Sequence, residues 1–253
     1  MDAVNRQVEE LFQRDSAEEK GLEKESRSAY LQSSYIDKWA GFPLYQNTQT
    51  KYYSCGEEMF PDMLEALRGA KHFIFLEYFI IEEGYMFNTI LDILEEKAKA
   101  GVDVRFIYDD VGSINSISFG YYKKLQERGI PCVTFNPFKP LISVVMNNRD
   151  HRKIFVVDGY IGFTGGINLA DEYINKVKRF GYWKDTGVRI EGEAVWSLTA
   201  MFLEMWNYIN RSTEDYSRFL PSVYREKEFT SDGFVQPSVS YTHLRAHETS
   251  AHL

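Results

Sequence analysis

The chain has 253 residues, of which 44% are hydrophobic and 26% charged, a composition typical of a folded globular protein and not of a disordered one. Its net charge of −8 argues against binding of nucleic acid through an overall positive field. Cys55 and Cys132 form no CxxC pair, so we expect two reduced, packed thiols instead of a disulfide framework or a cysteine zinc site. No apolar run approaches the ~18 residues of a membrane span, and the charged N-terminus lacks a signal-peptide pattern.

Residues 1–42 are predicted to form a charged helical arm. The segment from Asp2 to Ser28 is rich in Glu, Lys, Arg and Gln, a composition that favours a helix or an arm surrounded by solvent. We expect the folded domain to occupy residues 43–211.

Strand and helix patterns alternate through residues 43–211. Apolar residues at helical spacing predict helices at Gly56–Gly69, Phe87–Ala100, Phe119–Arg128, Asn168–Lys176 and Ala194–Asn210. Apolar or alternating runs predict strands at Lys51–Ser54, Lys71–Ile81, Val102–Tyr108, Pro131–Phe135, Lys153–Val157, Tyr160–Thr164 and Thr186–Ile190. Strand–helix–strand repeats with short connections predict an α/β fold, with a mixed, largely parallel β-sheet flanked by helices on both faces.

The pattern fades after Arg211, and residues 212–238 are predicted to begin a linker. From Val239 the string VSYTHLRAHET fits no period and resembles the translation of a transposon-based sequencing adapter, so residues 239–253 are expected to be a non-native tail. Three of the five histidines lie in that tail, and we exclude them from the functional interpretation: His243, His247 and His252.

The chemistry concentrates in the stretch Asn147–Asn175. His151 is followed two residues later by Lys153 and, after four more spacers, by Asp158. Residues two apart on a strand face the same side, so His151 and Lys153 should project together from an apolar strand. A neutral imidazole can attack phosphorus, and a lysine can neutralise charge on the non-bridging oxygens, without a metal or another cofactor. The alternative for His151 alone is a hydrogen-bonded structural histidine.

A glycine turn follows this motif. Gly165 and Gly166 come directly after the second predicted strand of the region and lead into a predicted helix. Such a turn exposes backbone N–H groups, and Asn168 adds a side-chain amide. We therefore expect Gly165, Gly166 and Asn168 to bind substrate phosphate oxygens.

HxKx₄D followed by GGxN is the signature of the phospholipase D superfamily. The flanking segments are similar to those of bacterial cardiolipin synthases over roughly Tyr45 to Tyr208. They are LEYFI (Leu76–Ile80), GVDVRFIYDDVGS (Gly101–Ser113), NNRDHRKI (Asn147–Ile154), FTGGINLADEYIN (Phe163–Asn175) and RFGYWKDTGV (Arg179–Val188).

The resemblance implies a phospholipase D-like fold and an enzyme that joins two phosphatidylglycerol molecules into cardiolipin, releasing glycerol through a phosphatidyl-histidine intermediate. It implies no cofactor, no metal and no nucleic-acid partner, and a catalytic domain on the cytoplasmic side of the cell membrane. Family members usually carry two such motifs and N-terminal membrane-spanning helices. This sequence has one motif and no such helices, so we expect a first half whose partners are the membrane surface and a missing second half.

Several carboxylates near the motif have candidate roles. A nucleophilic imidazole needs an acceptor at its other nitrogen, and Asp185 is expected to provide it, as the resemblance also implies. The resemblance implies an orienting, structural role for Asp158. Glu77 lies on an apolar strand, where a buried carboxylate needs a partner such as Lys153 or Arg105, and its role, catalytic or structural, stays open.

Two further features have competing interpretations. Asp109 and Asp110 end a strand, and loop capping is favoured over metal binding. The apolar segment Phe138–Met146 is either packed under the site or forms a lip for acyl chains opposite Tyr182 and Trp183.

Three functions stay open from the motif alone. The first is phosphatidyl transfer to make cardiolipin. The second is a phosphodiesterase that uses water as acceptor and cleaves phospholipid or nucleic acid. The third is a lipid-binding fragment without turnover, because this chemistry requires a second histidine that the chain does not supply.

Overall fold

The computed structural model describes residues 10–12, 16–137, 149–179, 181–224, 228–229, 231 and 233–239. One sheet of seven strands organises this part of the chain, in the spatial order β1-β7-β6-β5-β2-β3-β4. The strands are β1 (Thr48–Tyr53), β2 (Phe73–Tyr78), β3 (Asp103–Asp109), β4 (Cys132–Phe135), β5 (Ile154–Val157), β6 (Ile161–Gly165) and β7 (Gly187–Gly192).

The sheet is mixed, as predicted, but it is mostly antiparallel, so the expectation of a largely parallel sheet is wrong. Only β2, β3 and β4 run parallel to one another, and the other four pairings are antiparallel. The reason lies in the turn between β5 and β6, where Asp158 and Gly159 have φ angles of +50° and +73°. Two successive residues with positive φ are typical of a tight hairpin turn, which joins antiparallel neighbours without a crossover helix.

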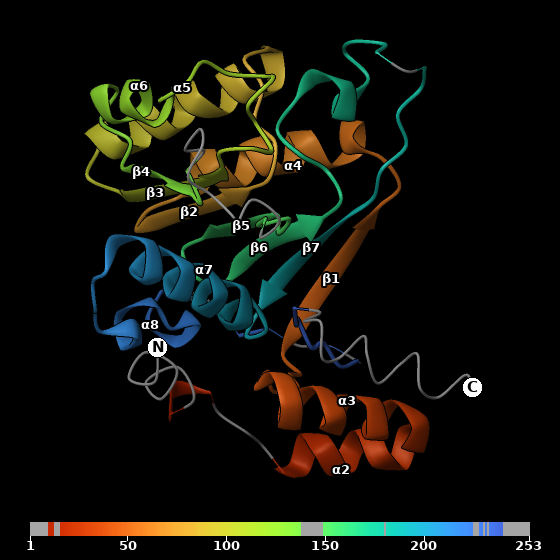
Figure 1. The fold of residues 1–253 in the computed structure, drawn as a ribbon. Coiled ribbons are helices and arrows are strands. Elements are labelled where there is room, and N and C mark those ends of the chain that lie inside the picture. Colours follow the sequence, from red (N-terminus) through yellow and green to blue (C-terminus); the bar gives the residue numbers. More distant parts are fainter. Residues whose placement is uncertain are drawn as a thin grey trace.

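Helices cover both faces of the sheet, as predicted (Figure 1). One face carries α4 (Gly56–Gly69), α5 (Tyr85–Lys99) and α6 (Tyr122–Glu127). The opposite face carries α7 (Val195–Asn210), with the short helices η2 (Tyr216–Phe219) and α8 (Pro221–Tyr224) beside it. The N-terminal helices α2 (Ser16–Glu25) and α3 (Arg27–Ala40) lie against each other beyond the start of β1.

The predicted helix at Asn168–Lys176 is only a single 3₁₀ turn, η1 (Asp171–Ile174). The Asp171 carboxylate accepts the backbone N–H groups of Tyr85 and Met86 at 2.9 and 2.7 Å, and so joins this turn to the start of α5. The side chain thus serves a tertiary contact that local periodicity does not reveal.

Side-chain alternation along the strands divides the core in two. On β2, Ile74 and Leu76 pack towards α4 and α5, whereas Phe73 and Phe75 pack towards α7. The same alternation on β5 sends Phe155 and Val157 to the first layer and Ile154 and Val156 to the second. Successive side chains just before β5 therefore point to opposite faces of the sheet, and this alternation determines which of them reach the site.

The stretch predicted to begin a linker packs onto the domain where it is described. Tyr216 and Phe219 are buried in the α7 layer. Val235 forms an antiparallel bridge with Tyr45, with reciprocal N–H···O bonds of 2.9 Å. Cys55 and Cys132 are free and buried, as expected. The three tail histidines lie outside the described residues.

Candidate active site

The motif lies at one edge of the sheet. His151 and Lys153 immediately precede β5, and the antiparallel register places the start of β5 opposite the end of β2, with Ile154 facing Glu77. The last residue of β6 and the first of β7, Gly165 and Gly187, meet at the same edge. This edge gathers the carboxyl ends of the parallel strands, where open α/β sheets place their ligands.

His151 and Lys153 share one neighbour, Phe79. The centroid of the Phe79 ring lies 4.7 Å from that of the His151 ring and 5.5 Å from Lys153 Nζ. Lys153 is only 4% exposed, and its Nζ donates a hydrogen bond to the His151 carbonyl oxygen at 2.7 Å. His151 itself is exposed. The two side chains therefore lie together against the Phe79 ring, in agreement with the two-residue spacing.

Sequence reasoning gave Phe79 no role. The sequence feature that could have identified Phe79 was its position directly after the apolar strand β2, at the edge of the sheet where the parallel strands end. The absence of a side chain at Gly112 lets this loop lie against Phe79, because a Cβ at Gly112 would lie 2.4 Å from the Phe79 carbonyl oxygen and 2.6 Å from its ring. The close approach of this loop thus helps to fix the aromatic surface beside His151 and Lys153.

The electrostatics of the pair suit nucleophilic attack. Burial, and next the positive charge of Lys153, lower the pKa of His151 below its ordinary 6.5. Burial also lowers the pKa of Lys153 to about 8, against the opposing effect of Asp185 and Asp150. At pH 7 the imidazole is therefore neutral while the ammonium is still mostly charged. A neutral nitrogen nucleophile beside a cation is the combination that attack on a phosphodiester requires.

Asp185 lies near this pair but does not bond to its histidine in the described structure. Its charge favours the protonated forms of both His151 and Lys153. Its Oδ1 accepts the N–H of Thr186 at 2.8 Å, and a Cβ at Gly166 would lie 2.0 Å from that oxygen. The expected role of Asp185 as the orienter of His151 stays a prediction.

The GGxN residues have structural partners. Gly165 has a φ of +146°, and a Cβ there would lie 2.4 Å from the Thr186 carbonyl oxygen. The Gly166 N–H donates to the same oxygen at 3.0 Å. Asn168 is buried, with Oδ1 accepting from Ile80 N at 3.0 Å and Nδ2 donating to the Tyr173 hydroxyl at 2.7 Å.

These contacts revise the expected mode of action of the turn. In this structure the Gly166 amide and the Asn168 side chain make hydrogen bonds within the protein that hold the edge of the sheet together. The absence of side chains at Gly165 and Gly166 lets Asp185 and Thr186 approach the motif. Binding of substrate phosphate by Gly165, Gly166 and Asn168 stays a prediction.

Asp158 lies at the opposite end of β5 from His151. It is 1% exposed, and its carboxylate accepts three backbone N–H groups at the start of β2, from Lys71, His72 and Phe73, at 2.8, 2.7 and 2.9 Å. The structure therefore gives this residue the structural role that the resemblance implied. The sequence pattern groups Asp158 with His151, Lys153 and Asp185 as catalytic, and that assignment stays a prediction, in which Asp158 acts by holding β5 to the start of β2.

Glu77 is fully buried, and its partner is Arg152 instead of Lys153 or Arg105. Arg152 Nε lies 2.7 Å from Glu77 Oε1 and 3.0 Å from Asp150 Oδ1. Strand alternation explains the correction, because Arg152 points towards the α7 layer, as Glu77 does, while Lys153 points the other way. Arg105 is occupied on β3, where it pairs with Asp103 and Glu214 at 2.8 and 2.7 Å.

Burial dominates the electrostatics of this acidic cluster. It raises the pKa of Glu77 well above its usual value, an effect that Arg152 opposes. Burial also raises the pKa of Glu204, on α7, to about 7, again against Arg152. A single guanidinium thus interacts with several carboxylates beside the start of β5. Sequence reasoning missed this network because Glu77 and Glu204 are far from Arg152 in the chain.

Asp109 has the loop-capping role that was favoured for it. Its carboxylate accepts the N–H groups of Gly112 and Asp150 at 2.8 and 2.9 Å. In the part of the chain that the structure describes, no three His, Cys, Asp or Glu side chains converge as metal ligands. The predicted acyl-chain lip, Phe138–Met146, lies outside the described residues. Of the residues expected opposite it, Tyr182 is exposed and Trp183 packs against Tyr173 with ring centroids 5.1 Å apart.

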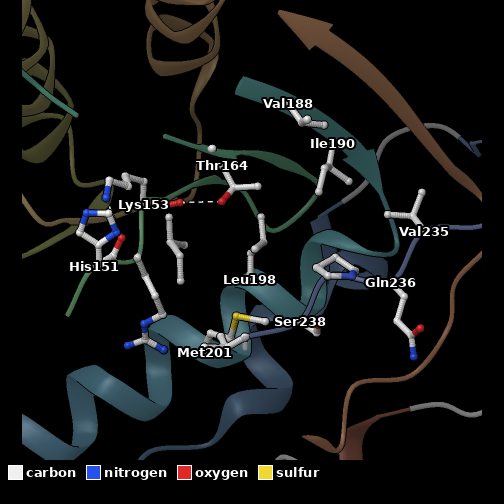
Figure 2. A pocket seen from close by; sticks show the side chains of 15 residues that line it. His151, Lys153, Thr164, Val188, Ile190, Leu198, Met201, Val235, Gln236 and Ser238 are labelled. Carbon is white, nitrogen blue, oxygen red and sulfur yellow. Dashed lines mark hydrogen bonds between the residues drawn. The ribbon is translucent and has the colours of Figure 1, made fainter. Parts of the chain in front are cut away.

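A cavity of about 410 Å³ adjoins the motif on the α7 side of the sheet. Figure 2 shows His151 and Lys153 at one end of it, with side chains of β7 and α7 beyond them. The site therefore combines an exposed histidine and a buried lysine with an adjacent pocket that is partly open to solvent.

Comparison with known proteins agrees with this geometry. Residues 63–206 match the family model described as "Cardiolipin synthase, PLD-like domain". An uncharacterized protein of Streptococcus mutans is 44% identical over 230 residues, which cover 91% of this chain and 49% of that protein. A protein of Alkalihalophilus pseudofirmus named cardiolipin synthase is 43% identical over 196 residues, covering 77% of this chain and 38% of that protein. The chain thus spans half or less of the length of these relatives.

Among solved structures, a phosphatidylserine synthase from Haemophilus influenzae superposes with a TM-score of 0.51 at 19% identity, over 78% of this chain and 44% of that chain. This likeness concerns the fold. Fold and motif define a phospholipase D-type domain with one histidine–lysine pair. The chain belongs to the cardiolipin synthase family of phospholipase D-like domains. Among the described helices, none combines the length and apolarity needed to cross a bilayer.

Proposed function

We propose that this chain supplies the nucleophilic half of a cardiolipin synthase. The observation that carries the proposal is the pairing of an exposed His151, whose pKa is lowered, with the buried cation Lys153 at the reactive edge of the sheet. The relatives named cardiolipin synthase support phosphatidylglycerol as the substrate. The chain spans 38% and 37% of two of them, which supports a second half as the required partner.

The proposed reaction has two displacements at phosphorus. In the first, an imidazole nitrogen of His151 attacks the phosphorus of one phosphatidylglycerol, the bond to the glycerol oxygen breaks, and glycerol leaves after taking up a proton. In the second, a hydroxyl of another phosphatidylglycerol attacks the phosphatidyl-histidine, loses its proton, and releases His151 with cardiolipin as product. Lys153 offsets the charge that develops on the non-bridging oxygens in both steps.

The partner half has a defined task in this scheme. A glycerol alkoxide is too basic to leave unprotonated, so a general acid must protonate it and then, as base, activate the acceptor. His72 is no substitute, because it lies at the start of β2 and stacks on Tyr224, with ring centroids 4.4 Å apart. We expect the intact enzyme to act at the cytoplasmic face of the cell membrane, with the catalytic edge towards phospholipid.

An activated substrate tests the first step on this chain alone. A phosphatidyl ester of p-nitrophenol needs no general acid, because nitrophenolate leaves without a proton. We expect a burst of about one equivalent of nitrophenolate from the wild-type chain and from His72→Ala, and none from His151→Ala. A burst that survives in His151→Ala would refute the assignment. In the intact enzyme, cardiolipin as product supports transfer, whereas phosphatidic acid alone would show hydrolysis.

A further inference from the structure

The cavity beside the motif is a pocket partly open to solvent. Its volume is about 410 Å³. Small-molecule sites span roughly 300–1,000 Å³, so this cavity falls within their range. One of its ends is formed by His151, Lys153 and Gly165, the residues of the reactive edge.

Beyond that end the walls are apolar. Five aliphatic or thioether side chains line them, from β5, β7 and α7 (Figure 2): Ile154, Val188, Ile190, Leu198 and Met201. They converge because the strand residues share the face that alternation directs towards α7. An apolar wall that adjoins His151 and Lys153 suits an amphiphilic ligand, whose phosphate would lie at this pair and whose apolar part would lie along the wall.

Three polar side chains in this lining have partners within the protein. The Thr164 hydroxyl donates to the Lys153 carbonyl oxygen at 2.8 Å. The Gln236 amide donates to the Ser33 and Phe42 carbonyl oxygens at 3.1 and 2.8 Å. Arg152 is ion-paired with Glu77. Thr164 and Gln236 therefore use their hydrogen-bonding groups within the protein, and the wall beyond the reactive edge is mainly apolar.

The remaining wall is a strap formed by residues 235–238, followed by Val239 of the segment expected to be non-native, and it lies across the cavity from the sheet. Val235 is tied to Tyr45 by two backbone hydrogen bonds of 2.9 Å, and the bonds of Gln236 anchor the next residue. The slot is therefore held open without a ligand, which lowers the entropic cost of filling it.

We propose that this cavity binds a fatty acyl chain of the phosphatidyl group whose phosphorus is held at His151 and Lys153. The inference rests on the proposed function and deepens it, because it assigns the place of the lipid's apolar part. An acyl chain needs no hydrogen-bond partner, and each buried methylene adds roughly fourfold in affinity. A nucleic-acid ligand fits poorly, because none of the described residues that line the cavity is a Phe, Tyr or Trp that could stack on a base.

Calorimetry with two ligands tests the proposal on the chain as it stands. The first is phosphatidylglycerol with two eight-carbon chains, used as monomer, and the second is glycerophosphoglycerol, the same headgroup without chains. We expect the lipid to bind at least about 100-fold more tightly, with a negative heat-capacity change from apolar burial. Equal affinities would overturn the acyl-chain site. Failure of both ligands to bind would overturn the acyl-chain site and also the proposed function on which it rests.

A variant that fills the cavity provides the spatial test. Val188 is half-buried and lines the cavity, so Val188→Phe should weaken binding of the eight-carbon lipid at least 10-fold and leave glycerophosphoglycerol unaffected. The matched control is Val177→Phe, on an exposed loop outside the cavity, which should change neither affinity. Unchanged lipid affinity in a folded Val188→Phe protein would contradict the proposal.

A photoreactive lipid covers the case in which Val188→Phe does not fold. Phosphatidylglycerol with a diazirine near the end of an acyl chain should label peptides that contain Leu198 and Met201 of the wild-type chain. Labelling confined to other surfaces would overturn the site. The nitrophenolate burst separates the two failures, because a burst that does not depend on acyl-chain length removes only the acyl-chain site, whereas an absent burst removes the proposed function.

Discussion

The two sides of the segment that leads into β5 carry opposite chemistry. On one side His151 and Lys153 lie at the open edge, and burial and mutual repulsion lower the pKa of His151. On the other side Arg152 enters the α7 layer, where burial raises the pKa of Glu77. The segment before β5 thus holds a neutral imidazole and a lysine cation together on one side, while an ion pair with Glu77 holds the intervening Arg152 on the other. A buried ion pair directly behind a site can fix the position of reactive groups that themselves have few contacts.

Breaking the buried side should have the largest effect on stability. Arg152→Met leaves Glu77, Asp150 and Glu204 without the guanidinium, and losing one partner of a buried ion pair costs about 3–5 kcal/mol. Urea unfolding followed by circular dichroism measures this loss. It should be larger at pH 8 than at pH 5, because the folded-state pKa of Glu77 is raised and the carboxyl is destabilising once it ionises.

The double variant Glu77→Met/Arg152→Met provides the control for that prediction. Replacement of both partners by apolar side chains removes the unpaired charge and should recover most of the stability. If Arg152→Met alone is as stable as the wild type at both pH values, the buried pair does not anchor the strand.

Breaking the reactive side should reduce the rate without unfolding the protein. Lys153→Ala removes the charge that stabilises the transition state, and loss of one such group costs about 10²–10³-fold in rate. Stopped-flow measurement of the nitrophenolate burst gives the rate, and an unchanged melting curve excludes misfolding. A burst within twofold of the wild-type rate would show that Lys153 plays no electrostatic part.

The pH dependence of the burst sharpens the comparison. The rate should rise as His151 loses its proton, with a midpoint below 6.5, and should fall above about pH 8 as Lys153 loses its charge. Lys153→Arg keeps its charge throughout this range and should move the alkaline limb to higher pH. An alkaline limb that stays at the same pH in this variant would assign it to a group other than Lys153.

The smallest effect is expected at Asp185. No described hydrogen bond joins it to His151, and its charge only favours protonation of the pair from nearby. Asp185→Asn removes a nearby negative charge that favours the charged form of Lys153, and should slow the burst on the order of 10-fold, which corresponds to about 1.4 kcal/mol. The matched control is Asp110→Asn, in the loop after β3, which should leave the rate unchanged. Equal rates for Asp185→Asn and wild type would remove Asp185 from the site.

Local patterns predicted the helices and strands closely but not how they pair. The helix at Gly56–Gly69 has the predicted bounds, because its apolar spacing is a local property. The antiparallel β5–β6 pairing followed from the Asp158–Gly159 turn, whose consequence for strand direction the prediction did not use. A hairpin signal of this kind carries more topological information than the alternation of strands and helices.

The site divides in the same way. The proximity of His151 and Lys153 followed from their two-residue spacing, which any strand enforces. The contacts of Phe79 and the Glu77–Arg152 pair depend on strand register between segments more than 70 residues apart, as the sequence numbering shows. Periodicity carries no information about register, so those contacts required the structure.

The central claim is that His151 becomes covalently bonded to phosphorus. Peptide mass spectrometry after reaction with the nitrophenyl phosphatidyl ester tests it most directly, because each of the five histidines can be located separately. The account predicts a phosphatidyl adduct on the peptide that contains His151, lost in His151→Ala and strongly reduced in Lys153→Ala. Nitrophenolate release with no adduct on His151, or with the adduct on His72, would contradict it.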